Sequence, residues 1–381
     1  MRVRAGYPDV VYFVKPSEEN DELRISLRSL KNLNHGKIVI VGHKPTWVSD
    51  RIIHISTSQI EGEKYSNVRK NWLALLEDDR ISDTFILMND DFYIMQPTEV
   101  VEPLRRIKPL DHYIELFAQL QANSHYVETM RRAHDLLKEW GINNPDSYEL
   151  HVPMLFEKQK VIELFDRVPE NVGHTRTMYG NYYKLGGKRI EDVKIINDDQ
   201  AITYDQRFLS TSDESYSHGK VGAYLRKKFA KVLIFSHAND PDGLLSVILA
   251  QLAFTDVEYL LTNSPQKDIT KYLQEHDVSE YDYIFITDIY PGRPVLEALP
   301  NAYWFDHKQL SIDKIKQHNL ILPNATIRIE LNGQPTSGSE LLYSWLRNNK
   351  LIGEESASFV EYIRAIDTWD FSGSLFNNGT Y

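Results

Sequence analysis

Acidic and imidazole side chains recur in four groups along the second half of the chain. In chain order they are His237, Asn239, Asp240 and Asp242, then Asp288, then Asp306 and His307, and finally Asp367. The first three groups each follow or close an apolar run that is typical of a buried parallel strand. Such strand ends face one crevice, where several carboxylates would repel one another unless they hold cations. The pattern predicts a site for two divalent ions that activate water for attack on phosphorus.

An acidic pair in the first half, Asp90-Asp91, follows the apolar run TFILM and Asn89. Two adjacent carboxylates at a strand end suit a divalent ion bound to a diphosphate, because the ion neutralises the departing nucleotide. A turn or hairpin that merely uses these residues is the alternative interpretation.

Strand-like and helix-like runs alternate in both halves and would position these groups. The first half has strand-like runs at 10–14, 37–42, 51–56 and 84–90, and helical patterns at 22–33, 67–76 and 113–140. The second half has strand-like runs at 231–237, 257–263, 281–288 and 301–307, and helical patterns at 243–254, 337–349 and 356–367. This alternation predicts α/β domains with mainly parallel, doubly wound sheets. The segment 208–230 is rich in Ser and Gly and then basic, so we expect domains at 1–228 and 229–381.

Composition narrows the class of protein. The 381 residues exceed one typical domain of roughly 100–200 residues. Without cysteine, disulfides, thiolate catalysis and zinc–thiolate sites are excluded, and Asp, Glu, His and Asn ligands favour Mg²⁺ or Mn²⁺. No apolar run is long enough for a membrane span and no signal-peptide pattern is present, which favours a cytoplasmic protein. The net charge of −11 argues against strong binding of duplex DNA.

The C-terminal groups resemble the motifs of the DHH phosphoesterase family. SHANDPDG (236–243) is similar to its first motif, TD (287–288) to the second, FDH (305–307) to the third and IDTW (366–369) to the fourth. The resemblance covers 231–371 and implies a metal-dependent phosphoesterase. It implies that two Mn²⁺ or Mg²⁺ ions are ligated by His237, Asp240, Asp242, Asp288, His307 and Asp367, with Asp288 as the bridge. Asp306 would ligate or orient, and Asn239 would help to position the phosphate.

Two departures from the family pattern change this expectation. Lys308 follows Asp306-His307 where the family has a second histidine that faces the reacting phosphate. A lysine would offer a flexible positive donor there instead. Only residues 368–381 follow Asp367, whereas the family adds a substrate-clamping domain. Either the chain is a truncated piece, or the first domain or another protein, in a homo-oligomer or a complex, completes the grip on the substrate.

Blocks in the first half resemble the Stealth family of sugar-phosphate transferases, whose fold is like that of GT-A glycosyltransferases. The similar segments are PDVVYFV (8–14), NDELRISLRSL (20–30), KIVIVGHKPTW (37–47), FILMNDDFYIMQP (85–97), ELHVPMLFEK (149–158) and GHTRTMYGNYY (173–183). The resemblance covers 8–199 and implies transfer of a sugar or sugar phosphate from a nucleotide sugar.

The Stealth resemblance also implies roles for single residues. Asp90 and Asp91 would hold one Mg²⁺ or Mn²⁺ ion. His151 and Arg176 would lie near the transferred group, with His151 as base on the acceptor hydroxyl. Arg24 and Arg28, one helical turn apart, would meet the nucleotide phosphates. Asp198 and Asp199 would supply a second acidic pair near the acceptor. A solvated helix face, a structural histidine and a helix cap are the alternatives for these residues.

Together the patterns favour a bifunctional enzyme, with a GT-A-like transferase domain followed by a DHH-type phosphoesterase domain. Two alternatives stay open. In the first, only the transferase domain is catalytic and the second domain binds or oligomerises. In the second, the C-terminal domain acts on cyclic dinucleotides or on short single-stranded nucleic acid, which Arg226-Lys227-Lys228 would attract.

Overall fold

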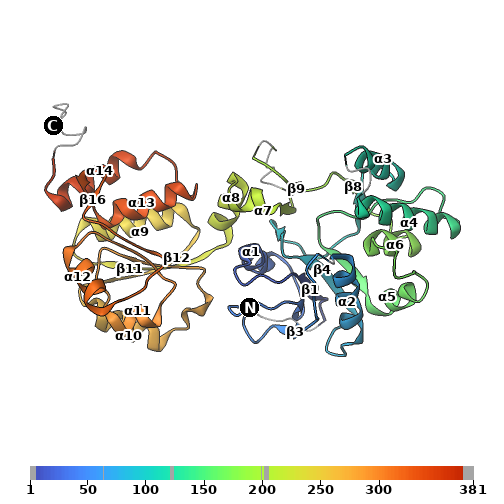
Figure 1. The fold of residues 1–381 in the computed structure, drawn as a ribbon, viewed down its shortest axis with the longest axis horizontal. Helices are drawn as coiled ribbons and strands as arrows, with labels where there is room; N and C mark the ends of the chain where they lie inside the picture. The colour runs from blue at the N-terminus through green and yellow to red at the C-terminus, as the bar shows by residue number, and fades with distance from the viewer. Residues whose placement is uncertain (1–5, 63, 121–123, 199, 201–205, 372–381) are drawn as a thin grey trace. The chain divides into compact units, whose positions relative to one another are not determined.

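The computed structural model describes residues 6–62, 64–120, 124–198, 200 and 206–371. The chain forms two compact units, Met1–Ser215 and Tyr216–Tyr381 (Figure 1). The division lies N-terminal to the predicted boundary at 228/229, because helix α8 (Lys220–Phe229) belongs to unit 2. Lys227 on this helix is tied to unit 2, since its carbonyl accepts from the Thr255 amide at 3.0 Å.

Unit 1 is built on a five-stranded sheet in the order β3-β2-β1-β4-β7. The strands are β1 (Asp9–Val14), β2 (Ile38–Gly42), β3 (Ile53–Ile55), β4 (Thr84–Asn89) and β7 (Met154–Glu157). All neighbouring pairs are parallel except β4 and β7. Alternate residues of β1 enter different cores: Val11 packs with α2 and α4–α6, whereas Val10 and Tyr12 pack with α1. Burial on both faces explains the nearly unbroken apolar run.

Unit 1 also contains two small sheets and a group of helices. The sheets are β5 (Phe92–Ile94), β10 (Phe208–Thr211) and β9 (Lys194–Ile195) in that order, and β6 (Leu104–Arg106) with β8 (Lys188–Ile190). The helices are α1 (Asp21–Ser29), η1 (Leu30–Asn32), α2 (Lys64–Glu77), α3 (Leu110–Leu120), α4 (His125–Glu139), α5 (Lys158–Phe165), α6 (Thr175–Tyr182) and α7 (Asp213–Ser217), the last of which crosses the division. The strand β10 lies inside the segment that we expected to separate the domains, so this part of the prediction is wrong.

The single long helix predicted at 113–140 is also wrong, because α3 ends at Leu120 and α4 begins at His125. Ser124 is the N-cap of α4, and its Oγ accepts a hydrogen bond from the Val127 amide at 3.3 Å. A serine that caps a helix satisfies a main-chain amide that would otherwise lack a partner, and it favours a helix start at this place.

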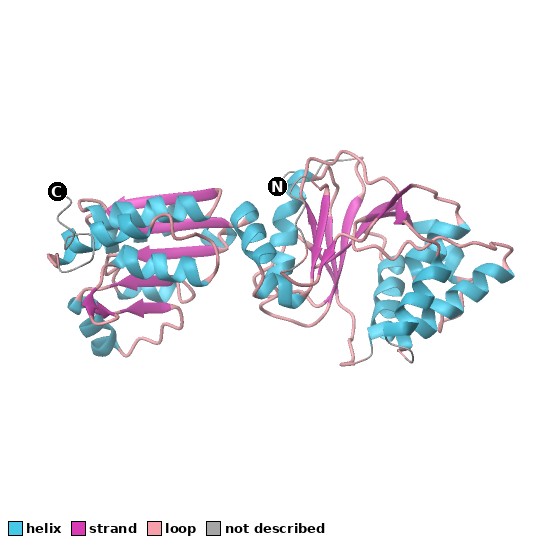
Figure 2. Ribbon diagram, turned by 90° about the horizontal axis from the view of Figure 1, so that it is seen from above, coloured by secondary structure: helices cyan, strands magenta, loops and turns pink. Residues whose placement is uncertain are grey.

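Unit 2 has a fully parallel sheet in the order β12-β11-β13-β14-β15. Its strands are β11 (Lys231–His237), β12 (Asp256–Thr262), β13 (Tyr283–Thr287), β14 (Tyr303–Asp306) and β15 (Ala325–Ile327), with a short hairpin of β16 (Glu330–Leu331) and β17 (Gln334–Pro335). The helices after α8 are α9 (Pro241–Ala253), α10 (Pro265–Glu275), η2 (Val278–Glu280), α11 (Arg293–Ala298), α12 (Gln309–His318), α13 (Gly338–Asn348) and α14 (Ala357–Thr368). Helices α9, α13 and α14 cover one face and α10–α12 the other (Figures 1 and 2). The predicted α/β architecture with parallel sheets is confirmed.

In both units the strand order reverses next to the first strand. In unit 2, β12 lies on one side of β11 and β13 on the other, and in unit 1, β2 and β4 flank β1 in the same way. Ligands of open α/β sheets bind at such a switch point, outside the carboxyl ends of the strands. The residues that follow β11 and β13, and those that follow β1 and β4, therefore border the two candidate crevices.

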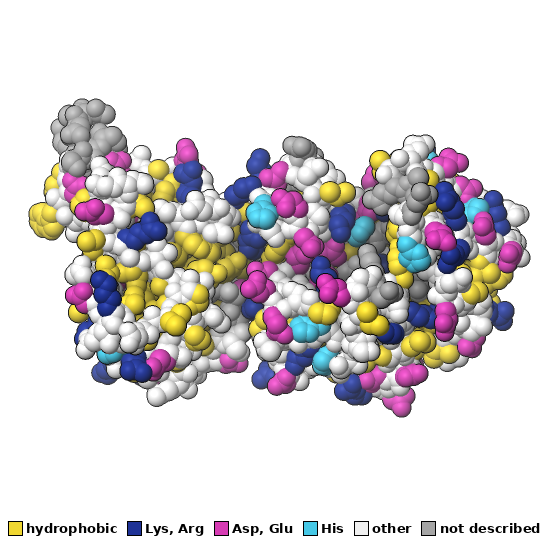
Figure 3. All heavy atoms as spheres, viewed as in Figure 1, with side chains coloured by type: hydrophobic (Ala, Val, Ile, Leu, Met, Phe, Trp, Pro, Cys, Tyr) yellow, Lys and Arg dark blue, Asp and Glu magenta, His cyan; other side chains and the backbone are white. Residues whose placement is uncertain are grey.

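The surface of the described part carries charges of both signs, which lie interspersed over unit 1 in the view of Figure 3. Arg226, which we expected in a basic entry patch with Lys227 and Lys228, is buried. Its Nη1 donates to the Tyr216 carbonyl at 3.1 Å, and its guanidinium lies over the Tyr216 ring. The prediction of a three-residue patch is therefore wrong for Arg226. No helix among the described residues is both long and apolar enough to cross a membrane.

Candidate functional site

Asp288 is the central residue of the site in unit 2. It follows β13, its side chain is fully buried, and its backbone is left-handed, with φ 57°. This conformation is uncommon outside Gly, Asn and Asp. Gly338 packs against it so closely that a Cβ at Gly338 would lie 2.9 Å from both the Cβ and the main-chain nitrogen of Asp288. The backbone conformation and this contact together hold the carboxylate at the end of the strand.

His237 and Asp240 approach Asp288 from the end of β11. Asp240 is the N-cap of α9, and its Oδ1 accepts a hydrogen bond from the Gly243 amide at 2.8 Å. Its Oδ2 pairs with His237 Nδ1, which lies 3.7 Å from Asp288 Oδ2. His237, Asp240 and Asp288 each offer a ligand atom within 4.8 Å of the others, a spacing that suits one metal ion.

A second ligand group shares Asp288 from the other side. It consists of Asp242, Asp288 and His307, whose ligand atoms also lie within 4.8 Å of one another. His307 Nε2 is 3.3 Å from Asp288 Oδ1 and 3.2 Å from Asp367 Oδ2. The structure thus brings together the six residues that the sequence motifs assigned as ligands, from β11, α9, β13, β14 and α14.

The residues of this cluster fit a divalent cation. Asp288 Oδ2, His307 Nε2 and Asp367 Oδ2 are buried and have no hydrogen-bond partner among the described residues, although oppositely charged groups lie nearby. Buried polar atoms are normally hydrogen-bonded. Carboxylate oxygens and imidazole nitrogens that converge without forming hydrogen bonds are the ligands that a Mn²⁺ or Mg²⁺ ion requires.

Two carboxylates of the cluster, Asp288 and Asp367, bind protons more readily than usual when no cation is present. Burial raises the pKa of Asp288. Burial, followed by the charge of Asp242, raises the pKa of Asp367 to about 7. A divalent cation would replace these protons, so the site is built to hold positive charge.

Three other predicted residues of unit 2 have different surroundings. Asp306 turns away from the cluster: its Oδ1 accepts from the amides of His307 at 2.8 Å and Lys308 at 3.3 Å, and its Oδ2 accepts from Ser311. This arrangement suits the orienting role that we expected, and not the ligating one. Asn239 is exposed. Lys308 is directed at Asp288, with its Nζ 2.5 Å from Oδ1.

The N-terminus of α13 belongs to the site and was missed. Asp242 is fully buried, and its carboxylate accepts from the amides of Gly338 at 2.8 Å and Ser339 at 3.1 Å, and from the Ser339 hydroxyl. Ser337 caps the same helix. The sequence Ser337-Gly338-Ser339-Glu340 before an apolar run indicates a capped helix. It does not indicate that the amides of this helix would bind Asp242.

In unit 1, Asp90 and Asp91 follow β4 and lie at the switch point. Asp90 Oδ2 accepts from Asn20 Nδ2 at 2.9 Å. Asp91 Oδ2 accepts from Lys194 Nζ at 2.9 Å and from Ser210 Oγ at 3.1 Å. Burial, followed by the charge of Asp91, raises the pKa of Asp90.

Glu22 on α1 joins this acidic group, and sequence reasoning missed it. Its Oε1 accepts from Thr211 Oγ1 at 2.7 Å. Burial, with the charges of Asp91 and Asp90, raises the pKa of Glu22 to about 7. Three carboxylates that repel one another in a partly buried place form a donor set suited to a hard cation. Among the described residues, however, the ligand groups with single-ion spacing lie in unit 2.

His151 has a carboxylate partner that sequence reasoning also missed. Its Nδ1 lies 2.8 Å from Asp192 Oδ2, and its amide donates to Asp192 Oδ1 at 3.0 Å. Arg106 Nη2 donates to the same carboxylate at 2.6 Å. Burial alone would raise the pKa of Asp192, but the hydrogen bond and charge of His151, with Arg106, lower it to about 2. A carboxylate that fixes one imidazole nitrogen orients the other for proton transfer.

The predicted arginines have structural contacts. Arg176 is buried, and its Nη1 donates to the Val152 carbonyl at 2.7 Å next to His151. Arg24 lies 4.1 Å from the centroid of the Trp47 ring and 3.8 Å from Asp21. Arg28 is half-buried on the same helix. Their contacts with phosphate stay predictions.

The second predicted acidic pair of unit 1 is only partly described. Asp198 is exposed in a turn after β9, and Asp199 lies outside the described residues. Its role near the acceptor therefore stays a prediction.

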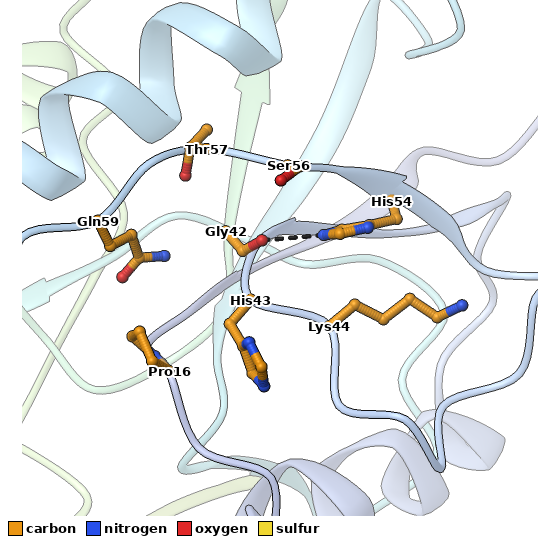
Figure 4. Close-up of a pocket in the computed structure, with 8 residues that line it drawn as sticks. All are labelled: Pro16, Gly42, His43, Lys44, His54, Ser56, Thr57 and Gln59. Atoms are coloured by element: carbon orange, nitrogen blue, oxygen red, sulfur yellow. Dashed lines mark hydrogen bonds between the residues drawn. The ribbon is translucent and has the colours of Figure 1, made fainter.

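A cavity of about 200 Å³ opens at the carboxyl ends of β1, β2 and β3 (Figure 4). Its lining residues are Pro16, Gly42, His43, Lys44, His54, Ser56, Thr57 and Gln59. His54 Nε2 lies 2.9 Å from the Gly42 carbonyl across the cavity wall, and His43 Nε2 lies 3.1 Å from Glu18. The lining is polar, with two imidazoles and a lysine, and suits a polar or anionic ligand.

Comparisons with known proteins do not define a family for this chain. No family model and no curated protein matches it. Among solved structures, the apo form of the glycosyltransferase GlyE from Streptococcus pneumoniae TIGR4 has a TM-score of 0.30 and 11% identity, over 94% of this chain and 100% of that one. A second GlyE structure has a TM-score of 0.29 and 11% identity, with the same coverage.

An uncharacterized protein from Helicobacter pylori G27 has a TM-score of 0.30 and 15% identity, over 38% of this chain. The chain spans 45% of the length of that protein. At TM-scores this low, the similarities are recorded as findings and support no further statement about this chain.

Proposed function

We propose that the chain is a bifunctional enzyme. Unit 2 would hydrolyse phosphoesters with divalent metal ions, and unit 1 would transfer a sugar or sugar phosphate from a nucleotide sugar. One observation carries the hydrolase: Asp288, a fully buried carboxylate at a switch point, is shared by two groups of ligands at single-ion spacing.

The residues of unit 2 have distinct tasks in this proposal. His237 and Asp240 hold a cation on one side of Asp288, and Asp242, His307 and Asp367 face the other side. A bound Mn²⁺ or Mg²⁺ ion would lower the pKa of water and neutralise phosphate charge. Asp306 fixes the turn that presents His307, and the N-terminus of α13 fixes Asp242. Water and phosphate would reach the site past Asn239, an exposed residue in the loop between β11 and α9.

The residues of unit 1 support the transferase by position and by contact. Asp90, Asp91 and Glu22 form an acidic group at the switch point, where a cation bound to a diphosphate would lie. The polar cavity beside β1–β3 would hold the nucleotide of the donor. His151, oriented by Asp192, would remove the proton from the acceptor hydroxyl.

The hydrolase is tested with the full chain, Mn²⁺, bis(p-nitrophenyl) phosphate and a linear dinucleotide. Asp288→Asn should lower turnover at least about 100-fold, because the change removes the charge shared by both ligand groups. Asp313→Asn is the matched control, since Asp313 is an exposed carboxylate on α12 whose Oδ1 accepts from Gln309. Equal turnover of the Asp288→Asn variant and the unchanged chain would refute the hydrolase.

The transferase is tested separately, by release of nucleoside phosphate from a panel of nucleotide sugars in the presence of Mn²⁺. His151→Ala should abolish release that depends on an acceptor, and Asp288→Asn should leave it intact. If Asp288→Asn abolished this release and His151→Ala left it intact, the assignment of the transferase to unit 1 would be overturned. Release by unit 1 with no phosphoester turnover by unit 2 would favour the alternative in which unit 2 only binds or oligomerises.

A further inference from the structure

The side chain of Lys308 is half-buried and reaches the ligand cluster with its ammonium group. Its Nζ donates to Asp288 twice, to the main-chain carbonyl and to Oδ1, each at 2.5 Å. Lys308 is also the N-cap residue of α12, and its amide donates to Asp306. Both ends of this side chain are therefore held, and its ammonium group cannot be treated as a free donor that waits for phosphate.

The partner of Lys308 is fixed as well. Asp288 has a left-handed backbone conformation and packs against Gly338, so it cannot swing away from the ammonium group without a shift of the main chain. The ammonium group therefore contacts a carboxylate that is held in place. It sets one positive charge beside Oδ1 of the carboxylate that both ligand groups share.

The two oxygens of Asp288 consequently differ. Oδ1 has Lys308 Nζ at 2.5 Å and His307 Nε2 at 3.3 Å. Oδ2 has no hydrogen-bond partner among the described residues and faces His237, at 3.7 Å. A cation held by His237, Asp240 and Oδ2 would meet an open oxygen. A cation held by Asp242, His307 and Oδ1 would meet an ammonium group on the same oxygen and would be repelled by it.

We infer that the ammonium group of Lys308 takes the place of a second metal ion, so that unit 2 binds one divalent cation tightly, at His237, Asp240 and Asp288. This inference rests on the proposed metal-dependent function of unit 2. It makes Lys308 a positioning residue that sets the number of bound ions. It also replaces the two-ion site expected from the sequence motifs with one ion and one fixed organic cation.

The test counts bound ions and does not depend on activity. The full chain is stripped with a chelator and titrated with Mn²⁺, and free Mn²⁺ is measured by electron paramagnetic resonance. The unchanged chain should bind one ion tightly, with the spectrum of an isolated Mn²⁺. Lys308→Met should bind two, with the exchange-coupled spectrum of a pair, and should strengthen the second binding step at least about 10-fold.

Two further variants make the test decisive. Lys314→Met removes a half-buried lysine of the same helix whose Nζ donates to Gln317, away from the ligand cluster, and it should leave one bound ion. Lys308→Gln keeps a hydrogen-bond donor without the charge, and it serves if the methionine variant does not fold. Two tightly bound ions in the unchanged chain, or one ion in every Lys308 variant, would overturn this inference and leave the proposed hydrolase standing. Absence of tight Mn²⁺ binding in all variants would overturn the proposed hydrolase together with it.

Discussion

The Gly338 amide donates a hydrogen bond to Asp242 Oδ2 at 2.8 Å, and this bond ties α13 to the first turn of α9. The same glycine lies against Asp288, so one residue without a side chain supports two members of the ligand cluster. Carboxylates at a helix N-terminus are stabilised by the free amides and the helix dipole. The contact thus satisfies the Asp242 carboxylate with hydrogen bonds in a fully buried place.

Gly338→Ala should therefore damage the metal centre. The new Cβ would lie 2.9 Å from the Cβ and main-chain nitrogen of Asp288, so the two elements must separate. Overpacking of this kind costs about 1–3 kcal/mol of unfolding free energy. Urea unfolding and Mn²⁺ titration should both show the loss. Gly173→Ala is the control, because its Cβ would meet Thr129 at an ordinary 3.4 Å. Unchanged Mn²⁺ affinity in Gly338→Ala would contradict the role of this contact.

Glu22 provides a pH-dependent prediction for unit 1 in chelator-treated protein. Its pKa is raised to about 7 in the folded chain, above the usual value near 4.3 of an unfolded glutamate. Between these values the folded state holds a proton that the unfolded state has lost, so stability falls as the pH rises and the loss is complete above about 7.

Glu22→Gln stays neutral and escapes this loss. Its gain in unfolding free energy should be near zero at pH 4 and on the order of 2 kcal/mol at pH 8, as measured by urea unfolding. Glu19→Gln, a change at an exposed glutamate of the preceding loop, is the control. A gain that is the same at both pH values would show that Glu22 is not held among the other carboxylates.

Asp192→Asn should separate chemistry from binding in the transferase. The change removes the acceptor that fixes His151 Nδ1, so acceptor-dependent turnover should fall about 100–1000-fold with little change in the donor KM. It also leaves Arg106 beside a neutral amide. Asp146→Asn is the matched control, because Asp146 pairs with Arg105 and Arg189 and has no histidine partner among the described residues. Equal losses in both variants would indicate a structural role only.

Much of this site could be predicted because its ligands follow apolar strands directly. His237 is the last residue of β11, Asp288 follows β13, and His307 follows β14, so parallel pairing alone brings them to one edge. The same reasoning places Asp90 and Asp91 at the end of β4. The period of an apolar run and the residues that directly follow it are local features that a single sequence reveals.

The contacts that define the chemistry could not be predicted in this way. The partner of Asp242 is 96 residues away, at Gly338, and the partner of His151 is 41 residues away, at Asp192. Neither separation follows from a periodic pattern, since each depends on how helices pack on the sheet. The direction of the Lys308 side chain was missed for the same reason. The sequence shows that the residue is charged, but only the fold shows that its ammonium group is paired with Asp288.

The cavity of unit 1 gives the last prediction. Ser56 lines it from the loop after β3 and is exposed, so Ser56→Trp should fill the cavity without disturbing the sheet. Nucleoside diphosphates should raise the unfolding temperature of the unchanged chain, since a ligand that binds only the folded state stabilises it. They should not do so in Ser56→Trp. Ser58→Trp places the same indole on an exposed residue that does not line the cavity, and it should keep the shift. Equal thermal shifts in the two tryptophan variants would place the nucleotide elsewhere.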